Sequence, residues 1–98
     1  GNTVKNDGGP DTPHYVRLTV VDKPGVLAEI TSILQTYDIS VESLLQQGRA
    51  PKDTVSLVMT THEVSVDLLT KALAEIEVLS CVQATPVAMP ILVNDLEG

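Results

Sequence analysis

Apolar and polar residues alternate in two stretches of the chain, residues 15–21 and 54–61, and this period of two predicts strands with one buried face. A third strand is expected over residues 39–48, which begin apolar and end in a polar pair. A last strand is expected from residue 81 to about 86, resuming through 93, at an edge or broken because two prolines remove ladder donors. The side chains expected to face the core from the two alternating strands are Val16, Leu18, Val20, Val55, Leu57 and Met59.

Between these strands the apolar period changes to that of a helix. Residues 25–37 and 66–78 each carry one apolar stripe, and Ser65 is a suitable N-cap for the second helix. The stripes consist of Val26, Leu27, Ile30, Ile33, Leu34 and Tyr37, and of Val66, Leu69, Leu73 and Ile76, flanked by Leu68 and Ala72. Helices that are apolar on one side only are expected to cover one face of a single sheet.

The resulting order, βαββαβ, predicts an α+β, ferredoxin-like fold: a four-stranded antiparallel sheet with both helices on one face. Residues 14–93 would form this domain. Residues 1–13, rich in Gly and Pro, are expected to be a linker or frayed terminus, and residues 94–98 a polar tail. The face away from the helices would be partly wet, with Arg17 available to a partner chain.

Composition narrows the functional classes. The net charge of −7 and an aromatic content of 2% argue against nucleic-acid binding, which needs basic patches and stacking platforms. Cys81 is the single cysteine, so it can form neither an internal disulfide nor a zinc knuckle, and its apolar neighbours predict a buried side chain. No membrane span or signal peptide is visible, which makes a cytoplasmic location the expectation.

No catalytic constellation stands out along the chain. The sequence has no phosphate loop and no metal-ligand spacing, and its carboxylates are scattered. We therefore expect a domain without catalytic residues, bound metal or cofactor.

The junction at residues 20–27 is the most informative segment. Asp22 could cap the following helix, Pro24 suits its first turn, and Gly25 would let a ligand approach the backbone. Free N–H groups at such a helix start suit the carboxylate of a small ligand. Two interpretations stay open at this point: a binding loop, or a strand-to-helix turn and nothing more.

This junction, the segment Tyr37-Asp38-Ile39-Ser40 and the βαββαβ order together resemble an ACT domain, a small ligand-sensing module. The resemblance implies a free amino acid as effector and pairing of two copies, with sites often lying between them. Its carboxylate would lie against backbone N–H groups near Gly25, and Asp22 would bind its ammonium unless that carboxylate caps the helix. The ligand-binding residues so implied are Asp22, Lys23, Pro24, Gly25, Val26, Leu27 and, in this chain or a partner, Ile39 and Ser40. The chain departs from the pattern where Asp38 replaces a common Gly and Ser40 a common Asn.

A narrower resemblance runs from Val55 through the second helix to Val87, and it points to the C-terminal regulatory region of homoserine dehydrogenase. It implies threonine as effector, a homodimer formed through the ACT domain, and a parent enzyme that is NAD(P)-dependent and acts in aspartate-family biosynthesis. Two alternatives remain: a dimerisation module without ligand, and an enzyme of the acylphosphatase type. The second would need an Arg in the first strand-to-helix loop, where this chain has only Lys23.

Overall fold

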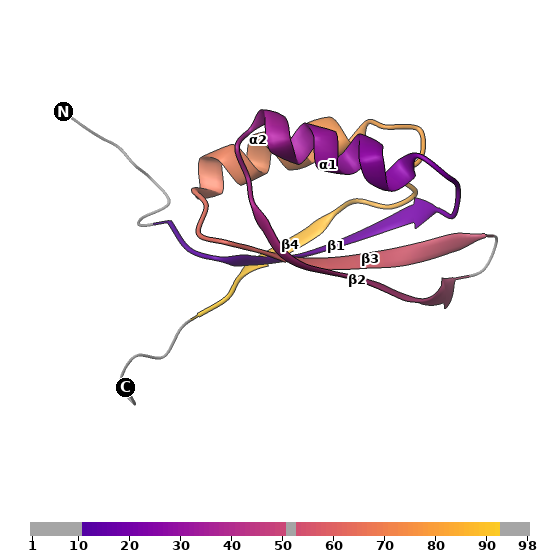
Figure 1. The fold of residues 1–98 in the computed structure, drawn as a ribbon, viewed down its shortest axis with the longest axis horizontal. Helices are drawn as coiled ribbons and strands as arrows, with labels where there is room; N and C mark the ends of the chain where they lie inside the picture. Colours follow the sequence, from indigo (N-terminus) through magenta and orange to yellow (C-terminus); the bar gives the residue numbers. More distant parts are fainter. Residues whose placement is uncertain (1–10, 51–52, 93–98) are drawn as a thin grey trace.

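The structure is a computed structural model that describes residues 11–50 and 53–92. Its elements follow in the order β1 (His14–Val21), α1 (Val26–Thr36), β2 (Val41–Ala50), β3 (Thr54–Thr61), α2 (Val66–Glu77) and β4 (Val87–Pro90). Both helices lie on the same side of the sheet, and its other side is bare in the described part of the chain (Figure 1).

The four strands form one antiparallel sheet in the order β2-β3-β1-β4. β1 and β3 are therefore central, and β2 and β4 are the two edges. The predicted ferredoxin-like fold is confirmed, because two βαβ units with crossovers over one face generate this strand order.

The core lies between the sheet and the helices. The side chains predicted to face inward from β1 and β3 are all buried, as are the central positions of both helical stripes. The buried hydrophobic residues are Val16, Leu18, Val20, Val26, Ile30, Leu34, Ile39, Val55, Leu57, Met59, Val64, Leu69, Ala72, Ile76 and Cys81. The stripes are narrower than predicted, because Leu27 and Val66 at their N-terminal ends stay about 40% exposed (41% and 40%).

The ends of the helices are set by a few residues. Ser65 caps α2 as predicted, its hydroxyl accepting a hydrogen bond from the backbone N–H of Leu68 at 3.0 Å. At the end of α1, Asp38 adopts a left-handed conformation (φ 59°), and Ile39 N–H donates to the Leu34 carbonyl at 2.9 Å. Asp38 thus occupies the left-handed position after a helix that most often holds glycine.

Two strands have bounds that differ from the prediction. The expected strand from residue 81 to 86 is wrong: beyond an isolated bridge at Val82, the chain there is turn and irregular structure, and β4 begins at Val87. Burial explains the error. Cys81 packs into the core from a loop, and its apolar neighbourhood resembles the sequence of a buried strand. β2 extends over residues 41–50, two positions later than predicted at each end.

The predicted linker and tail lie largely outside the described residues. Thr12 and Pro13 are part of the fold, however. Thr12 forms an isolated bridge with Val64, and the Pro13 carbonyl accepts a hydrogen bond from Ile91 N–H at 2.9 Å. No helix in the described part of the chain has the length and apolar character needed to cross a membrane.

Candidate functional site

The β1–α1 junction begins where β1 leaves the sheet. Asp22 N–H donates to the Asp53 carbonyl at 2.8 Å, which ties the junction to the start of β3. Helix α1 then starts at Val26, with Gly25 as its N-cap and no side-chain capping hydrogen bond. The sequence left open whether Asp22 caps this helix or binds a ligand, and the structure shows no cap by Asp22, which precedes the first helical position by four residues.

The turn requires glycine at position 25 for a different reason from the one expected. The φ of Gly25, 88°, lies in the left-handed region, which only glycine occupies readily, so the turn needs glycine for its own conformation. A Cβ built on Gly25 would meet nothing within 4 Å. Close approach of another group to this backbone is accordingly not visible in the structure.

The start of α1 presents unused donors. Val26 N–H reaches the Lys23 carbonyl at 3.4 Å, and the Gly25 carbonyl accepts from Glu29 N–H at 3.0 Å. Within the described residues, the N–H groups of Gly25, Leu27 and Ala28 have no hydrogen-bond partner. These N–H donors and the positive end of the helix dipole suit a carboxylate, whose binding here stays a prediction.

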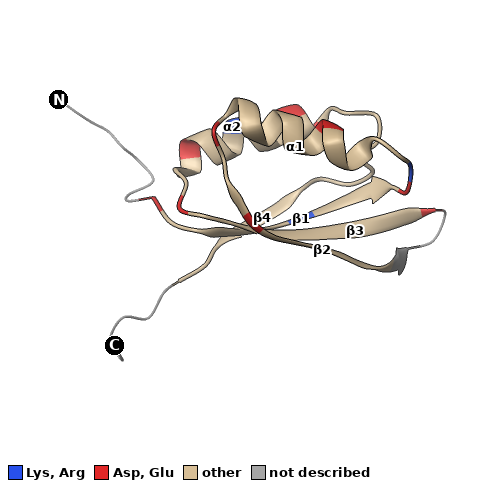
Figure 2. Ribbon diagram, in the orientation of Figure 1, with Lys and Arg blue, Asp and Glu red and all other residues tan. Residues whose placement is uncertain are grey.

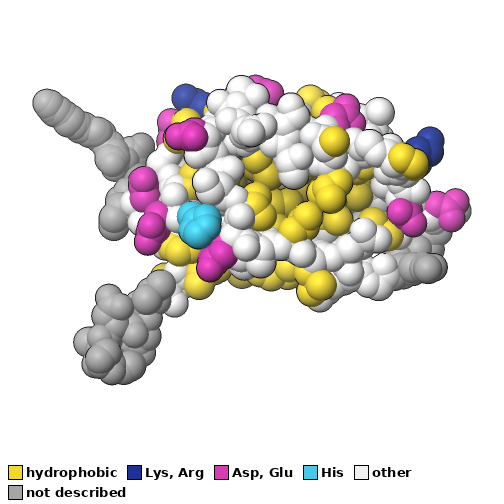
Figure 3. Space-filling view, in the orientation of Figure 1, with side chains coloured by type: hydrophobic (Ala, Val, Ile, Leu, Met, Phe, Trp, Pro, Cys, Tyr) yellow, Lys and Arg dark blue, Asp and Glu magenta, His cyan; other side chains and the backbone are white. Residues whose placement is uncertain are grey.

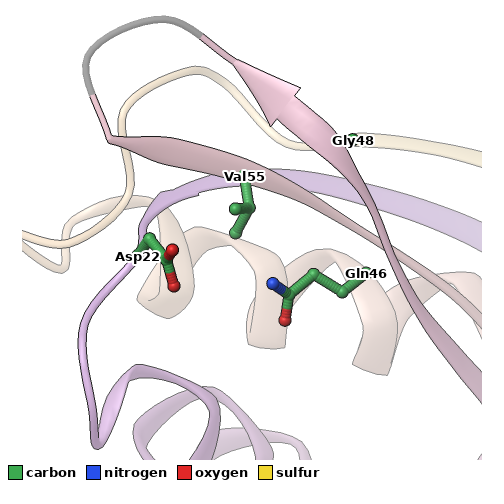
Figure 4. Close-up of a pocket in the computed structure, with 4 residues that line it drawn as sticks. All are labelled: Asp22, Gln46, Gly48 and Val55. Carbon is green, nitrogen blue, oxygen red and sulfur yellow. The ribbon is translucent and has the colours of Figure 1, made fainter.

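Beside this junction the surface is hollowed. A hollow of about 490 Å³ is lined by Asp22, Gln46, Gly48 and Val55. Figure 4 shows the carboxylate of Asp22, in the loop after β1, and the amide of Gln46, on β2, pointing into the same space with Val55 between them. A smaller adjoining recess is also lined by Asp22, Gln46 and Val55. Its remaining lining residues are Val20, Val21, Lys23, Val26, Leu27 and Leu57.

Of the predicted site residues, Asp22 lines the hollow, and Asp22, Lys23, Val26 and Leu27 line the adjoining recess of about 50 Å³. Pro24 and Gly25 shape the turn without lining either. Ile39 and Ser40 lie beyond the opposite end of α1, whose 11 residues span about 16 Å. Ile39 is 5% exposed in the core, and the Ser40 carbonyl accepts from His62 N–H. In this chain neither residue closes the hollow, and their contribution from a partner chain stays a prediction.

Three residues that line the hollow were not predicted as site residues, namely Gln46, Gly48 and Val55, and Gln46 is the one with a polar side chain. It pairs in register with the buried Leu57, so its side chain lies on the helix side of the sheet, where polar residues are otherwise rare. The sequence carried a signal: Gln46 falls at a position where β2, paired with the β3 pattern, should present an apolar residue. An amide there can both donate and accept hydrogen bonds.

Apolar surface continues from the hollow along α1 and β2. Figure 3 shows apolar side chains gathered in the middle of the face, between the helices and the edge strand. Leu44 and Val41 pair with the buried Met59 and Thr61, so both point toward α1. Leu44 and Leu27 stay 40% and 41% exposed. This side of the molecule therefore offers an unpaired strand edge together with exposed apolar side chains.

Charge at the junction is mixed rather than uniformly acidic. An acidic and a basic segment adjoin in the β1–α1 loop (Figure 2), which corresponds to Asp22 and Lys23. The described residues contain no group of three His, Cys, Asp or Glu side chains that could hold a metal ion. A neighbouring carboxylate and cation are the chemistry that complements a zwitterion.

In the described part of the chain, two side chains have a shifted pKa, and both lie away from the hollow. Burial, and then the nearby Glu29 carboxylate, raises the pKa of the Cys81 thiol. The hydrogen bond that Tyr37 donates to Glu75 raises the pKa of its phenol and joins the end of α1 to α2. Both groups contribute to structure, and neither contacts the candidate site.

Comparison with known proteins connects this geometry to a family. Residues 14–81 match the profile of the ACT domain. Homoserine dehydrogenase of Neisseria gonorrhoeae is 34% identical over 76 residues, which are 78% of this chain and 17% of that protein. The enzyme of Pseudomonas aeruginosa is 30% identical over 82 residues, 83% of this chain and 19% of its own length.

Solved structures give the same relationship. Homoserine dehydrogenase of Thiobacillus denitrificans superposes with a TM-score of 0.72 at 33% identity, covering 81% of this chain and 17% of that one. The regulatory subunit of aspartate kinase from Thermus thermophilus shares the fold, with a TM-score of 0.59 at 21% identity over 90% of this chain and 57% of that one. The chain spans less than a fifth of the homoserine dehydrogenases it matches, and, with a family match over residues 14–81, it belongs to the ACT domain family.

Proposed function

We propose that this chain is the amino-acid-binding regulatory domain of a homoserine dehydrogenase, and that threonine is its effector. The observation that carries the proposal is the convergence of Asp22 and Gln46 on one hollow beside unused N–H groups at the start of α1. The similarity to homoserine dehydrogenases supports the parent enzyme, which would use NAD(P) in aspartate-family biosynthesis and work in the cytoplasm.

Each part of an amino acid has a complement in the hollow. The effector carboxylate would accept hydrogen bonds from N–H groups near Gly25 and Leu27, with Lys23 adding positive charge. The effector ammonium would pair with Asp22, which is free for this because it does not cap the helix. For threonine, the side-chain hydroxyl would bond to the Gln46 amide while its methyl group contacts Val55.

The hollow is open on its outer side, where Asp22, Gln46 and Gly48 are all exposed. A second copy packed against α1 and β2 would cover Leu27 and Leu44 and close the hollow. It would also satisfy the free edge of β2. We therefore propose a homodimer with the ligand between the copies, which is where Ile39 or Ser40 of a partner could contribute.

An effector bound there regulates only through different affinities for two states of the parent enzyme. A coupling free energy of about 1–3 kcal/mol would change activity about 5- to 150-fold. Regulation therefore has to be measured on the parent enzyme, whereas effector binding can be measured on this chain.

Thermal unfolding with each common amino acid in turn tests the binding. At about 100 times its dissociation constant, the effector should add about 2.7 kcal/mol. For a domain of this size that raises the melting temperature by roughly 10–20 °C. Asp22→Asn and Gln46→Leu should each remove most of the shift. Gln83→Leu, at an exposed position outside the hollow, is the control and should preserve it. If no amino acid stabilised the chain, whether monomeric or dimeric, the domain would instead be a dimerisation module without a ligand.

A further inference from the structure

The face of the sheet opposite the helices has no cover in the described chain (Figure 1). It is not a uniformly polar surface. Leu45, Val87 and Met89 are 56%, 46% and 50% exposed on it, and Val58 pairs in register with Leu45. Exposed apolar side chains that gather on one face usually mark a contact surface. We call this surface the open face.

Arg17 stands at the centre of the open face. In register it lies between Val58 of β3 and Val87 of β4. Among the described residues, its guanidinium donates a single long hydrogen bond, 3.4 Å to the Tyr15 hydroxyl. Within the described residues no carboxylate reaches it, since the one ion pair there joins Lys71 and Asp67 on α2. Most of its five N–H donors are therefore unpaired.

The open face also lacks acidic groups. Apart from the bulge of β2 that carries Glu42, no register position on this side of the four strands is Asp or Glu, although the chain has a net charge of −7. Most of the described acidic residues lie instead on the helices and in the loops (Figure 2). The open face thus combines apolar and uncharged polar side chains with one cation at its centre, on an otherwise acidic molecule.

These features restrict what can cover it. Burying an arginine without a partner is costly, so the occupant needs a carboxylate opposite Arg17 within an apolar surface. A second copy packed symmetrically would present its own open face, which has no carboxylate at the matching positions. The homoserine dehydrogenases similar to this chain have more than four fifths of their length outside it.

We propose that the open face is the docking surface for another part of the parent enzyme, one that presents an apolar surface with a carboxylate that pairs with Arg17. The proposal rests on the proposed function in one respect, that the chain is a module of a larger enzyme. It assigns the two sides of the domain to different partners: α1 and β2 to effector and second copy, and the open face to the part of the enzyme that is regulated.

Thiol labelling tests this contact, with maleimide as the probe. Leu45→Cys and Thr19→Cys place a thiol on the open face, and Val78→Cys, 80% exposed at the end of α2, is the control. The unsubstituted protein gives the background, since Cys81 is buried. Each variant is labelled in the 98-residue chain and in the full-length enzyme.

A face that is docked for about nine tenths of the time labels about tenfold more slowly. We expect this slowing in the full-length enzyme for both open-face thiols and not for Val78→Cys. Adding Arg17→Glu should restore fast labelling, whereas Lys71→Glu, on the far side of the domain, should not. The amino-acid response of the 98-residue chain should survive Arg17→Glu, so failure of docking and failure of effector binding can be told apart.

Equal labelling rates in chain and enzyme would overturn the proposal. Slow labelling that Arg17→Glu leaves unchanged would overturn the carboxylate-bearing occupant. If labelling of the 98-residue chain became slower as the protein concentration rose, a second copy would be the occupant, and this result would also overturn the proposal.

Discussion

Replacing Gly25 with alanine isolates the conformational cost of the turn that begins α1. The added Cβ meets nothing within 4 Å, so no steric contact contributes. What remains is a φ of 88°, which an L-residue adopts at a cost of about 1–2 kcal/mol. Because each kcal/mol moves the melting temperature of a domain this size by about 4–8 °C, Gly25→Ala should lower it by roughly 4–16 °C.

Thermal and urea unfolding followed by circular dichroism measure this change. The matched control is Gly25→D-Ala, made by ligation of a synthetic peptide, because a D-residue favours positive φ and adds the same methyl group. We expect the D-Ala protein to be at least as stable as the original and the L-Ala protein to be less stable. Equal destabilisation by the two enantiomers, or no loss with L-Ala, would refute the conformational explanation of Gly25.

Three further predictions follow from other positions. Asp38→Gly should raise the free energy of unfolding by about 0.5–1 kcal/mol in urea titrations, because Asp38 holds a left-handed conformation (φ 59°); a loss of stability would contradict this. Ile30→Ala, at a fully buried position, should cost about 2–5 kcal/mol, and a loss under 1 kcal/mol would mean that α1 is not packed as described. Because the pKa of the buried Cys81 thiol is raised in the fold, the unfolded chain ionises first. The stability that the neutral, buried Cys81 thiol contributes is therefore fully present below the ordinary thiol pKa and is lost as the pH rises through the pKa of the folded state. Relative to Cys81→Ala, the protein should lose stability over that range, and parallel pH profiles would contradict this.

The fold was predictable because its signals are local and consistent. Alternation along β1 and β3 fixed the buried face, and Ser65 marked the start of α2 by its capping chemistry. The segment around Cys81 was misassigned because a buried loop residue and a strand residue look alike in sequence when neither is strongly periodic. β4, with all four residues exposed, carried too little pattern to place its start.

The site was only half predictable, for a physical reason. The junction residues are contiguous, so their contribution to the hollow could be read from a short motif. Gln46 reaches the same hollow from β2 through strand register, which a single sequence does not fix once a bulge intervenes between Val41 and Ser43. The role of Asp22 could be assessed only in the structure. There Gly25 is the N-cap of α1, and the Asp22 carboxylate does not cap this helix.

The most direct test of the central claim is a threonine titration of the isotope-labelled chain followed by NMR. If the effector binds in the hollow, the backbone amides of Lys23, Gly25 and Leu27 and the side-chain amide of Gln46 should shift together with a single dissociation constant. Amides lining the groove between α2 and the segment before β4, around Thr70 and Thr85, should stay in place. Shifts confined to that groove, or none at saturating threonine, would contradict the account.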